Sequence, residues 1–220
     1  MAHYNIVFAT PGHSMTNNYV KSLASSIAFL NEIGLTWTFI NQSSSLVSLA
    51  REATIENSMV FDMNNNAPMK GEHTYDKIIS IDSDISWKPE QLIKLYNYDL
   101  DVVSGVYLCD DQDQSNIHLN ERPLLKKDFE RFKGPFKCDG VGFGFLAIRS
   151  GVFESMQRAW FTLSNVYLFS KKDPNKRLTV FVGEDLSWCN RVKHELNKDI
   201  WCDPSIRVTH HKTIGITFDE

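Results

Sequence analysis

Two acidic residues separated by a single residue follow an apolar segment in the first half of the chain. Asp82 and Asp84 come directly after Ile78-Ile79-Ser80-Ile81. Residues two apart on an extended backbone point to the same side, so the two carboxylates are predicted to lie close together and to repel each other. A divalent cation with oxygen ligands would remove this repulsion. Because open α/β sheets bind ligands at the carboxyl ends of their strands, these residues form a candidate metal site.

Strands and helices are expected to alternate around this segment. Apolar and β-branched runs predict strands at residues 5–9, 36–40, 77–81 and 101–107. Helices are expected at residues 17–33, 46–59 and 89–96, the first capped by Asn17 or Asn18 and the third beginning at Pro89. This alternation predicts an α/β fold with a mixed, mainly parallel central sheet and helices on both of its faces.

The second half of the chain has a less regular pattern. Residues 109–137 are highly charged without clear periodicity, which predicts a long loop. Further along we expect a strand at 143–148, helices at 151–159 and 184–196, and short strands near 200–201 and 206–208. Residues 165–176 fit either a hairpin or a flexible loop. No internal repeat is present, so residues 1–220 are expected to form a single domain.

Composition limits the class of protein. The 220 residues are 42% hydrophobic and carry a formal net charge of −4, which is typical of a globular protein and argues against a nucleic-acid partner. The four cysteines are scattered, which argues against a structural zinc site and favours reduced thiols in a cytoplasmic protein. The sequence contains no secretory signal pattern and no transmembrane segment, and contact with a membrane surface is left open.

Several short motifs occur in a particular order along the chain. They are Ser45–Glu52 with its Ala-Arg-Glu, the D-x-D run Asp82-Ser83-Asp84, the P-E-x-L run from Pro89, the D-V-V-x-G run from Asp101, the glycine-rich Asp139–Phe145, Gly183-Glu184-Asp185, and Asp203-Pro204 through Val208-Thr209-His210. In this order the chain resembles nucleotide-sugar glycosyltransferases of the GT-A fold over most of its length. The resemblance implies a single GT-A domain, with a nucleotide-binding half at 1–107 and an acceptor and catalytic half at 108–220.

The resemblance assigns a cation site. It implies that Asp84 binds Mn²⁺ or Mg²⁺ together with the diphosphate of the donor, and that Asp82 contacts the ribose, the ion or its water shell. His210 occupies the position of a late histidine ligand, and His211 is the adjacent alternative. Because neighbouring residues on a strand point to opposite faces, only one of these histidines is expected to be a ligand.

The resemblance also assigns catalytic and donor-binding residues. Asp185 matches the general base of inverting relatives, which accepts a proton from the acceptor hydroxyl, with Glu184 as the alternative; the competing interpretation is that both acids cap a helix. The positions assigned to the donor, implied to be a UDP-sugar, are Thr10, Pro11, Gly12, Asn41, Arg51, Asp82, Ser83, Asp139 and Gly142. For Arg51, contact with the diphosphate and an anchoring salt bridge are equally open. The implied acceptor is a glycan or glycoconjugate.

Two other functions remain open at this stage. Asp82 and Asp84 superficially fit the nucleophile and acid/base of haloacid dehalogenase-like phosphatases, although that motif normally lies on the first strand. A non-catalytic module that binds nucleotide sugars or glycans is the second. Trp87, Trp160 and Trp188 could stack on sugar rings, although core packing is expected for at least two of them.

Overall fold

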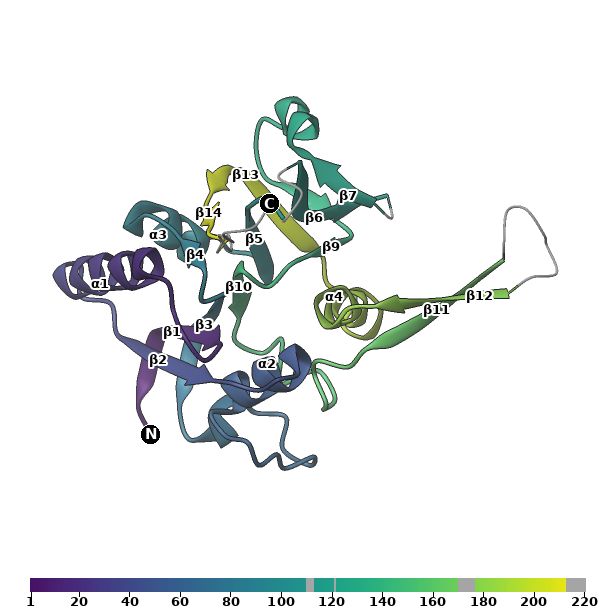
Figure 1. The fold of residues 1–220 in the computed structure, drawn as a ribbon. Helices are drawn as coiled ribbons and strands as arrows, with labels where there is room; N and C mark the ends of the chain where they lie inside the picture. The colour runs from purple at the N-terminus through teal and green to yellow at the C-terminus, as the bar shows by residue number, and fades with distance from the viewer. Residues whose placement is uncertain (110–112, 121, 170–176, 213–220) are drawn as a thin grey trace, which may run out of the picture.

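A seven-stranded sheet forms the centre of the computed structural model, which describes residues 1–109, 113–120, 122–169 and 177–212 (Figure 1). In spatial order its strands are β2 (Trp37–Gln42), β1 (His3–Pro11), β3 (Thr74–Ile81), β10 (Phe145–Arg149), β5 (Val102–Val106), β13 (Ile200–Arg207) and β8 (Phe136–Cys138). Strands β1, β2, β3, β5 and β13 run in one direction, whereas β10 and β8 oppose them. The sheet is therefore mixed and mainly parallel, and the fold is α/β, as predicted.

Helices cover both faces of this sheet because its strands are apolar on both sides. The helices are α1 (Asn17–Glu32), α2 (Val47–Glu56), α3 (Pro89–Asn97) and α4 (Glu184–Glu195), with 3₁₀ turns η1 (Pro68–Gly71) and η2 (Lys126–Arg131). Ile6 and Phe8 of β1 pack in the core cluster that includes residues of α1 and α3. Val7, between them, packs in the cluster that includes residues of α2 and α4. Strand alternation thus divides the core into two layers.

The N-terminal cap of α1 differs from the expectation. Thr16, and neither Asn17 nor Asn18, is the N-cap residue, and its side chain accepts a hydrogen bond from the backbone N–H of Tyr19. Threonine and asparagine are both preferred N-cap residues, so composition alone did not separate the neighbouring candidates.

The prediction of a long loop at 109–137 was wrong. This segment contributes β6 (Gln114–Leu119) and β7 (Arg122–Leu125), which join β9 (Gly140–Val141) in a three-stranded sheet ordered β7-β6-β9. It also contains η2 and part of β8. The prediction of a helix at 151–159 was also wrong, because those residues form turns and bends. Strands β11 (Ser164–Phe169) and β12 (Arg177–Val182) form a hairpin that projects from the body (Figure 1), and residues 170–176 of the ambiguous segment lie outside the described residues.

A two-stranded sheet brings the residues after the D-x-D run next to the last motif of the chain. Strand β4 (Ile85–Ser86) pairs with β14 (Thr209–His210), with Ile85 opposite His210.

No helix among the described residues has the length and apolar character that crossing a membrane requires. Cys138, Cys189 and Cys202 are buried free thiols, and Cys109 is exposed.

Candidate active site

A tight turn at the carboxyl end of β3 positions the two acidic residues. The strand ends at Ile81, and the N–H of Ile85 donates to the carbonyl oxygen of Asp82 at 3.0 Å, which closes the turn. The N–H of Asp82 donates to the carbonyl oxygen of Gly144 at 3.2 Å. Because residues 82–84 turn and do not continue as an extended strand, strand alternation does not govern their side chains. Asp82 and Asp84 consequently have different partners.

Asp84 faces His210 across the β4–β14 pair. Its Oδ2 lies 3.1 Å from Nε2 of His210, although the two residues are 126 positions apart. The Nδ1 atom of His210 lies 3.0 Å from the carbonyl oxygen of Leu108. His211 points elsewhere, with Nε2 2.7 Å from Oγ of Ser86 and Nδ1 3.2 Å from the amide nitrogen of Asn18. Of the two adjacent histidines, only His210 therefore directs its side chain to Asp84, although the backbone N–H of His211 donates to the carbonyl oxygen of Asp84 at 2.8 Å.

The Asp84–His210 pair fits a divalent cation. A carbonyl oxygen can only accept, so Nδ1 of His210 carries a proton. In the neutral imidazole the lone pair of Nε2, which can bind a metal ion, then faces Asp84. Histidine ligands of metals commonly donate their second ring N–H in this way. Ligand atoms about 2.1 Å from one ion at a right angle would be roughly 3 Å apart, which matches the observed 3.1 Å. Within the described ranges no three His, Cys, Asp or Glu side chains gather as a metal site, and Asp84 and His210 form a pair of candidate ligands.

Asp82 belongs to a buried ion-pair cluster. Nη1 and Nη2 of Arg51 lie 3.0 and 3.5 Å from the two carboxylate oxygens of Asp82, and Nε lies 3.2 Å from Oε1 of Glu184. The Arg51 side chain is 6% exposed. Burial lowers the pKa of Arg51, but the carboxylates of Asp82, Asp185 and Glu184 outweigh burial and raise it above its usual value. Of the two roles left open for Arg51, the geometry shows the salt bridge.

Asp185 lies at the amino end of α4, next to this cluster. Burial raises the pKa of its carboxyl, Arg51 opposes this change, and the neighbouring Glu184 adds to it. The net direction is upward, so this carboxylate holds a proton more tightly than an ordinary aspartate does. Glu184 differs because it is 7% exposed and pairs with Arg51. Glu184 is thus held by Arg51, whereas Asp185 lies beside this ion pair with a raised pKa, and neither residue lines the cavity that lies beside the acidic turn.

Tyr107 contacts both the glycine-rich segment and His210. Its hydroxyl accepts a hydrogen bond from the N–H of Gly144 at 3.1 Å, and its ring packs edge-on against His210 with centroids 5.4 Å apart. A Cβ added at Gly142 or Gly144 would lie less than 3.0 Å from Tyr107. The phenol thus explains why residues 142 and 144 are glycine. The sequence analysis did not identify this tyrosine.

A cavity of about 370 Å³ lies beside the acidic turn. The sequence-predicted residues that line it are Pro11, Gly12, Arg51, Asp82, Ser83, Asp84 and His210. Ser45, Val47 and Ala50 of the motif Ser45–Glu52 also line it, although the sequence assigned them no role, and so do Ser44 and Lys212, which sequence reasoning missed. Nζ of Lys212 lies 3.7 Å from Oδ2 of Asp84. Its position two residues after His210 is the spacing of side chains on the same face of an extended segment, which could have identified it.

Three other predicted donor residues are engaged in the protein's own structure. Thr10 is fully buried, and its hydroxyl hydrogen-bonds to Tyr19. The amide nitrogen of Asn41 donates to the carbonyl oxygens of Thr10 and Gly12, at 2.7 and 2.9 Å. Asp139 is outside the cavity lining; it pairs with Lys193 at 2.8 Å and accepts from the N–H of Asn120. Of these, only Asn41 holds the loop that borders the cavity.

The three tryptophans considered for sugar stacking lie in the core. Trp160 and Trp188 are fully buried, and Trp87 is 6% exposed. Trp87 also donates its ring N–H to Oγ of Ser26 at 2.9 Å. Their flat faces are therefore covered by protein.

Comparisons with known proteins show the fold. No protein-family model matches the chain, and no curated protein sequence matches it. A crystal structure of A197 from STIV is similar over 98% of this chain and 100% of that one, with a TM-score of 0.53 and 14% identity. The catalytic domain of Drosophila beta1,4-galactosyltransferase 7, in complex with xylobiose, is similar over 96% of this chain and 71% of that one, with a TM-score of 0.51 and 13% identity. The architecture is thus that of a GT-A-like domain.

Proposed function

We propose that this chain is a metal-dependent glycosyltransferase that moves a sugar from a nucleotide-diphosphate sugar to a hydroxyl group of a glycan or glycoconjugate. The observation that carries the proposal is the pairing of Asp84 with His210 beside the cavity at the carboxyl end of β3. The similarity of the fold to a galactosyltransferase catalytic domain supports it. Sites at this end of an α/β sheet are the usual places for ligands.

Asp84 and His210 are proposed to hold Mn²⁺ or Mg²⁺. A bound cation of this kind neutralises charge on a departing diphosphate. Two protein ligands leave the other positions to phosphate oxygens and water, which is the usual arrangement for ions that bind with substrate phosphates. The ammonium group of Lys212, 3.7 Å from Asp84, adds positive charge on the same side. Donor and cation are therefore expected to bind cooperatively.

Asp185 is proposed as the general base. It would take the proton of the acceptor hydroxyl as that oxygen attacks the anomeric carbon, so displacement is direct and the configuration inverts. The raised pKa of Asp185 strengthens it as a proton acceptor. Arg51 supports this role indirectly, because it compensates the charges of Asp82 and Glu184 and holds both residues in place.

Asn41 supports a UDP-sugar as the donor. Both of its amide hydrogens point to the carbonyl oxygens of Thr10 and Gly12, so its Oδ1 is the atom that remains for a ligand. An acceptor atom suits the N3–H of uracil. The same orientation holds Thr10-Pro11-Gly12 at the edge of the cavity, where Pro11 and Gly12 line it.

Calorimetry of Mn²⁺ binding tests the cation site. We expect weak binding by the protein alone and at least about tenfold tighter binding with UDP present. Asp84→Asn and His210→Gln should abolish this gain. His211→Gln and Asp99→Asn are matched controls, because His211 faces Ser86 and the Asp99 side chain is 99% exposed. Equal losses in H210Q and H211Q would contradict the assignment.

Turnover tests the chemistry separately. In the presence of Mn²⁺, slow release of free sugar from a UDP-sugar is expected, and Asp185→Asn should reduce it about 10²- to 10⁴-fold while UDP still binds. Donor binding without any turnover would identify a non-catalytic module. Hydrolysis of an aryl phosphate that Asp82→Asn abolishes would identify a phosphatase; the geometry disfavours this, since Arg51 engages both oxygens of Asp82.

A further inference from the structure

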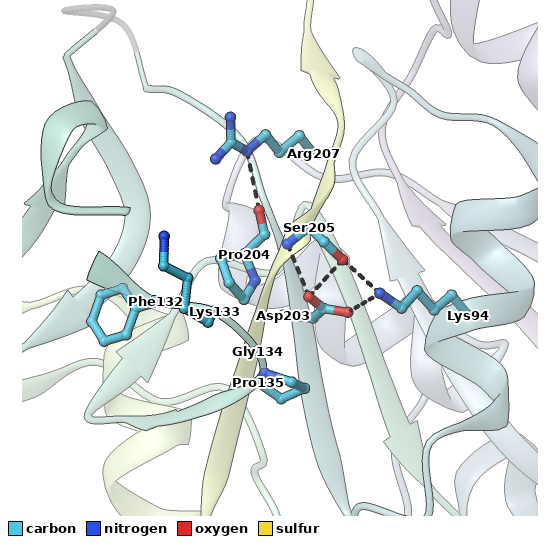
Figure 2. Close-up of a pocket in the computed structure, with 9 residues that line it drawn as sticks. All are labelled: Lys94, Phe132, Lys133, Gly134, Pro135, Asp203, Pro204, Ser205 and Arg207. Carbon is cyan, nitrogen blue, oxygen red and sulfur yellow. Dashed lines mark hydrogen bonds and ion pairs between the residues drawn. The ribbon is translucent and has the colours of Figure 1, made fainter. Parts of the chain in front are cut away.

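A second cavity, of about 560 Å³, lies where β13 leaves the sheet. Strand β8 pairs with β13 only as far as Cys202, opposite Phe136. Beyond Cys202 the register of β13 against β5 shifts before Arg207, so residues 203–206 bulge away from the ladder. The bulge, α3 and the segment 132–135 enclose the cavity (Figure 2).

The carboxylate in this cavity is neutralised by the protein itself. Asp203 is 1% exposed, and its oxygens accept from Nζ of Lys94 at 2.7 Å, the hydroxyl of Tyr98 at 2.6 Å, and the N–H and hydroxyl of Ser205 at 2.9 and 2.8 Å. Its charge is therefore balanced by Lys94 and its hydrogen bonds are complete. Asp203 shapes the bulge and does not leave a negative charge to repel a ligand.

Two further cations line the same cavity without a carboxylate partner among the described residues. Nε of Arg207 donates to the carbonyl oxygen of Pro204 at 3.0 Å, which orients the guanidinium and leaves both terminal NH₂ groups for a ligand. Nζ of Lys133 lies 3.3 Å from the carbonyl oxygen of Glu130, and this contact leaves the ammonium charge uncompensated. Figure 2 shows Lys94 reaching the cavity from α3 on one side of β13, with Lys133 and the guanidinium of Arg207 on the other. A concentration of positive charge at this point contrasts with the net charge of −4 of the whole chain.

The remaining wall of the cavity is apolar and fixed. Phe132 stacks on Phe136 with ring centroids 3.6 Å apart, and Pro135 and Pro204 complete this wall. A ligand that fits would therefore combine a compact anionic group with an organic part. An oriented guanidinium recognises phosphate oxygens through two parallel N–H bonds, while lysine acts as a point charge.

We propose that this cavity binds a phosphate ester, with the phosphate held by Arg207 and Lys133 and the organic group against Phe132. The shared chemistry admits a soluble phosphate ester or a phospholipid headgroup. Arg207 also lines a smaller cavity with Leu108, whose carbonyl oxygen accepts a hydrogen bond from His210.

Titration with glycerol 3-phosphate, followed by NMR chemical shifts, tests this proposal without metal or nucleotide sugar, so its outcome is independent of the sugar-transfer proposal. We expect saturable shifts at Lys94, residues 132–135 and residues 203–207. The variant R207Q/K133Q should bind at least about tenfold more weakly, the equivalent of one lost charged contact. The control K21Q/K70Q removes the same charge from exposed positions elsewhere and should bind like the wild type.

Single variants keep the test informative if the double variant folds poorly. Lys133→Gln changes an exposed residue, and Arg207→Lys keeps the charge but loses the two parallel N–H bonds; both should weaken binding. A vesicle arm separates the sources: binding to phosphatidylcholine vesicles only when they contain phosphatidic acid, with no binding of the soluble ester, identifies a headgroup site. Absence of binding to both probes, or equal binding by R207Q/K133Q and K21Q/K70Q, would overturn the proposal.

Discussion

The hydroxyl of Tyr107 is expected to be the reason that residue 142 must be glycine. A Cβ at this position would lie less than 3.0 Å from the hydroxyl oxygen, while its next neighbours, Cβ of Asn116 and Cζ of Tyr107, would be 3.3 and 3.5 Å away. Gly142→Ala therefore forces one oxygen to move within a packed core. Overpacking of this kind costs about 1–3 kcal/mol of unfolding free energy.

Removing the hydroxyl has a cost of its own. Tyr107→Phe leaves the N–H of Gly144 without the partner that lies 3.1 Å away, which costs about 1–3 kcal/mol for a buried donor. In G142A/Y107F the obstructing oxygen is absent, so the added methyl group fits against the ring. The double variant should therefore be about as stable as Y107F alone, with a coupling energy of roughly 1–3 kcal/mol.

Urea denaturation of the four proteins, followed by tryptophan fluorescence, measures this coupling. Gly134→Ala is the matched control, because a Cβ there would meet no atom within 4 Å. It should change stability little and show no coupling to Y107F. If the losses in G142A and Y107F add to within about 0.5 kcal/mol, the hydroxyl is not the obstruction and the explanation of the glycine is wrong.

Three other perturbations test the parts of the fold that support the site. Arg51→Met leaves the buried carboxylate of Glu184 and the partly buried carboxylate of Asp82 without their cation, and should lower the unfolding free energy by about 3–5 kcal/mol in urea. Arg122→Met at an exposed ion pair should cost less than about 1 kcal/mol. Burial raises the pKa of Asp203, but its hydrogen bonds, first that from Lys94, lower it overall. The wild type should therefore be more stable than D203N above about pH 4, and this advantage should decline as the pH falls through the lowered pKa. Urea denaturation at several pH values measures the difference. Phe143→Ala removes a ring that is 1% exposed and packs against two other aromatic rings, and should cost about 3–5 kcal/mol in the same assay.

The architecture followed from local patterns because the first half of the chain obeys them. Apolar runs of strand length alternate with amphipathic runs of helix length, and Pro89 begins α3 as expected. The segment 109–137 gave no such signal. It contains the locally paired strands β6 and β7, and the rest of its order comes from pairing with later residues. Ile117 of β6 pairs with Val141, and Phe136 of β8 pairs with Cys202. Pairing between strands so far apart leaves no local periodicity to detect.

The candidate site was accessible to sequence reasoning only where a motif fixed a position. His210 was placed with Asp84 through the order of motifs, and strand alternation separated it from His211. The partners of the buried side chains were not accessible in this way. Arg51 lies 31 residues from Asp82 and 133 from Glu184, and nothing in the spacing states that one guanidinium bridges both. Tyr107 was missed because an aromatic residue after a strand is normally read as core.

The two carboxylates of the D-x-D run therefore divide between different tasks. Asp82 is bound to a buried guanidinium that also holds Glu184 next to Asp185, so it belongs to the fixed framework of the site. Asp84 is 33% exposed, faces His210 and lines the cavity, so it remains available to a ligand. A turn of three residues between β3 and β4 is sufficient for this division, because it directs Asp82 toward Arg51 of α2 and Asp84 toward His210 of β14. The repulsion inferred from the spacing of the acids is thus relieved by their separation, because Arg51 balances Asp82 whereas Asp84 faces His210 across the β4–β14 pair.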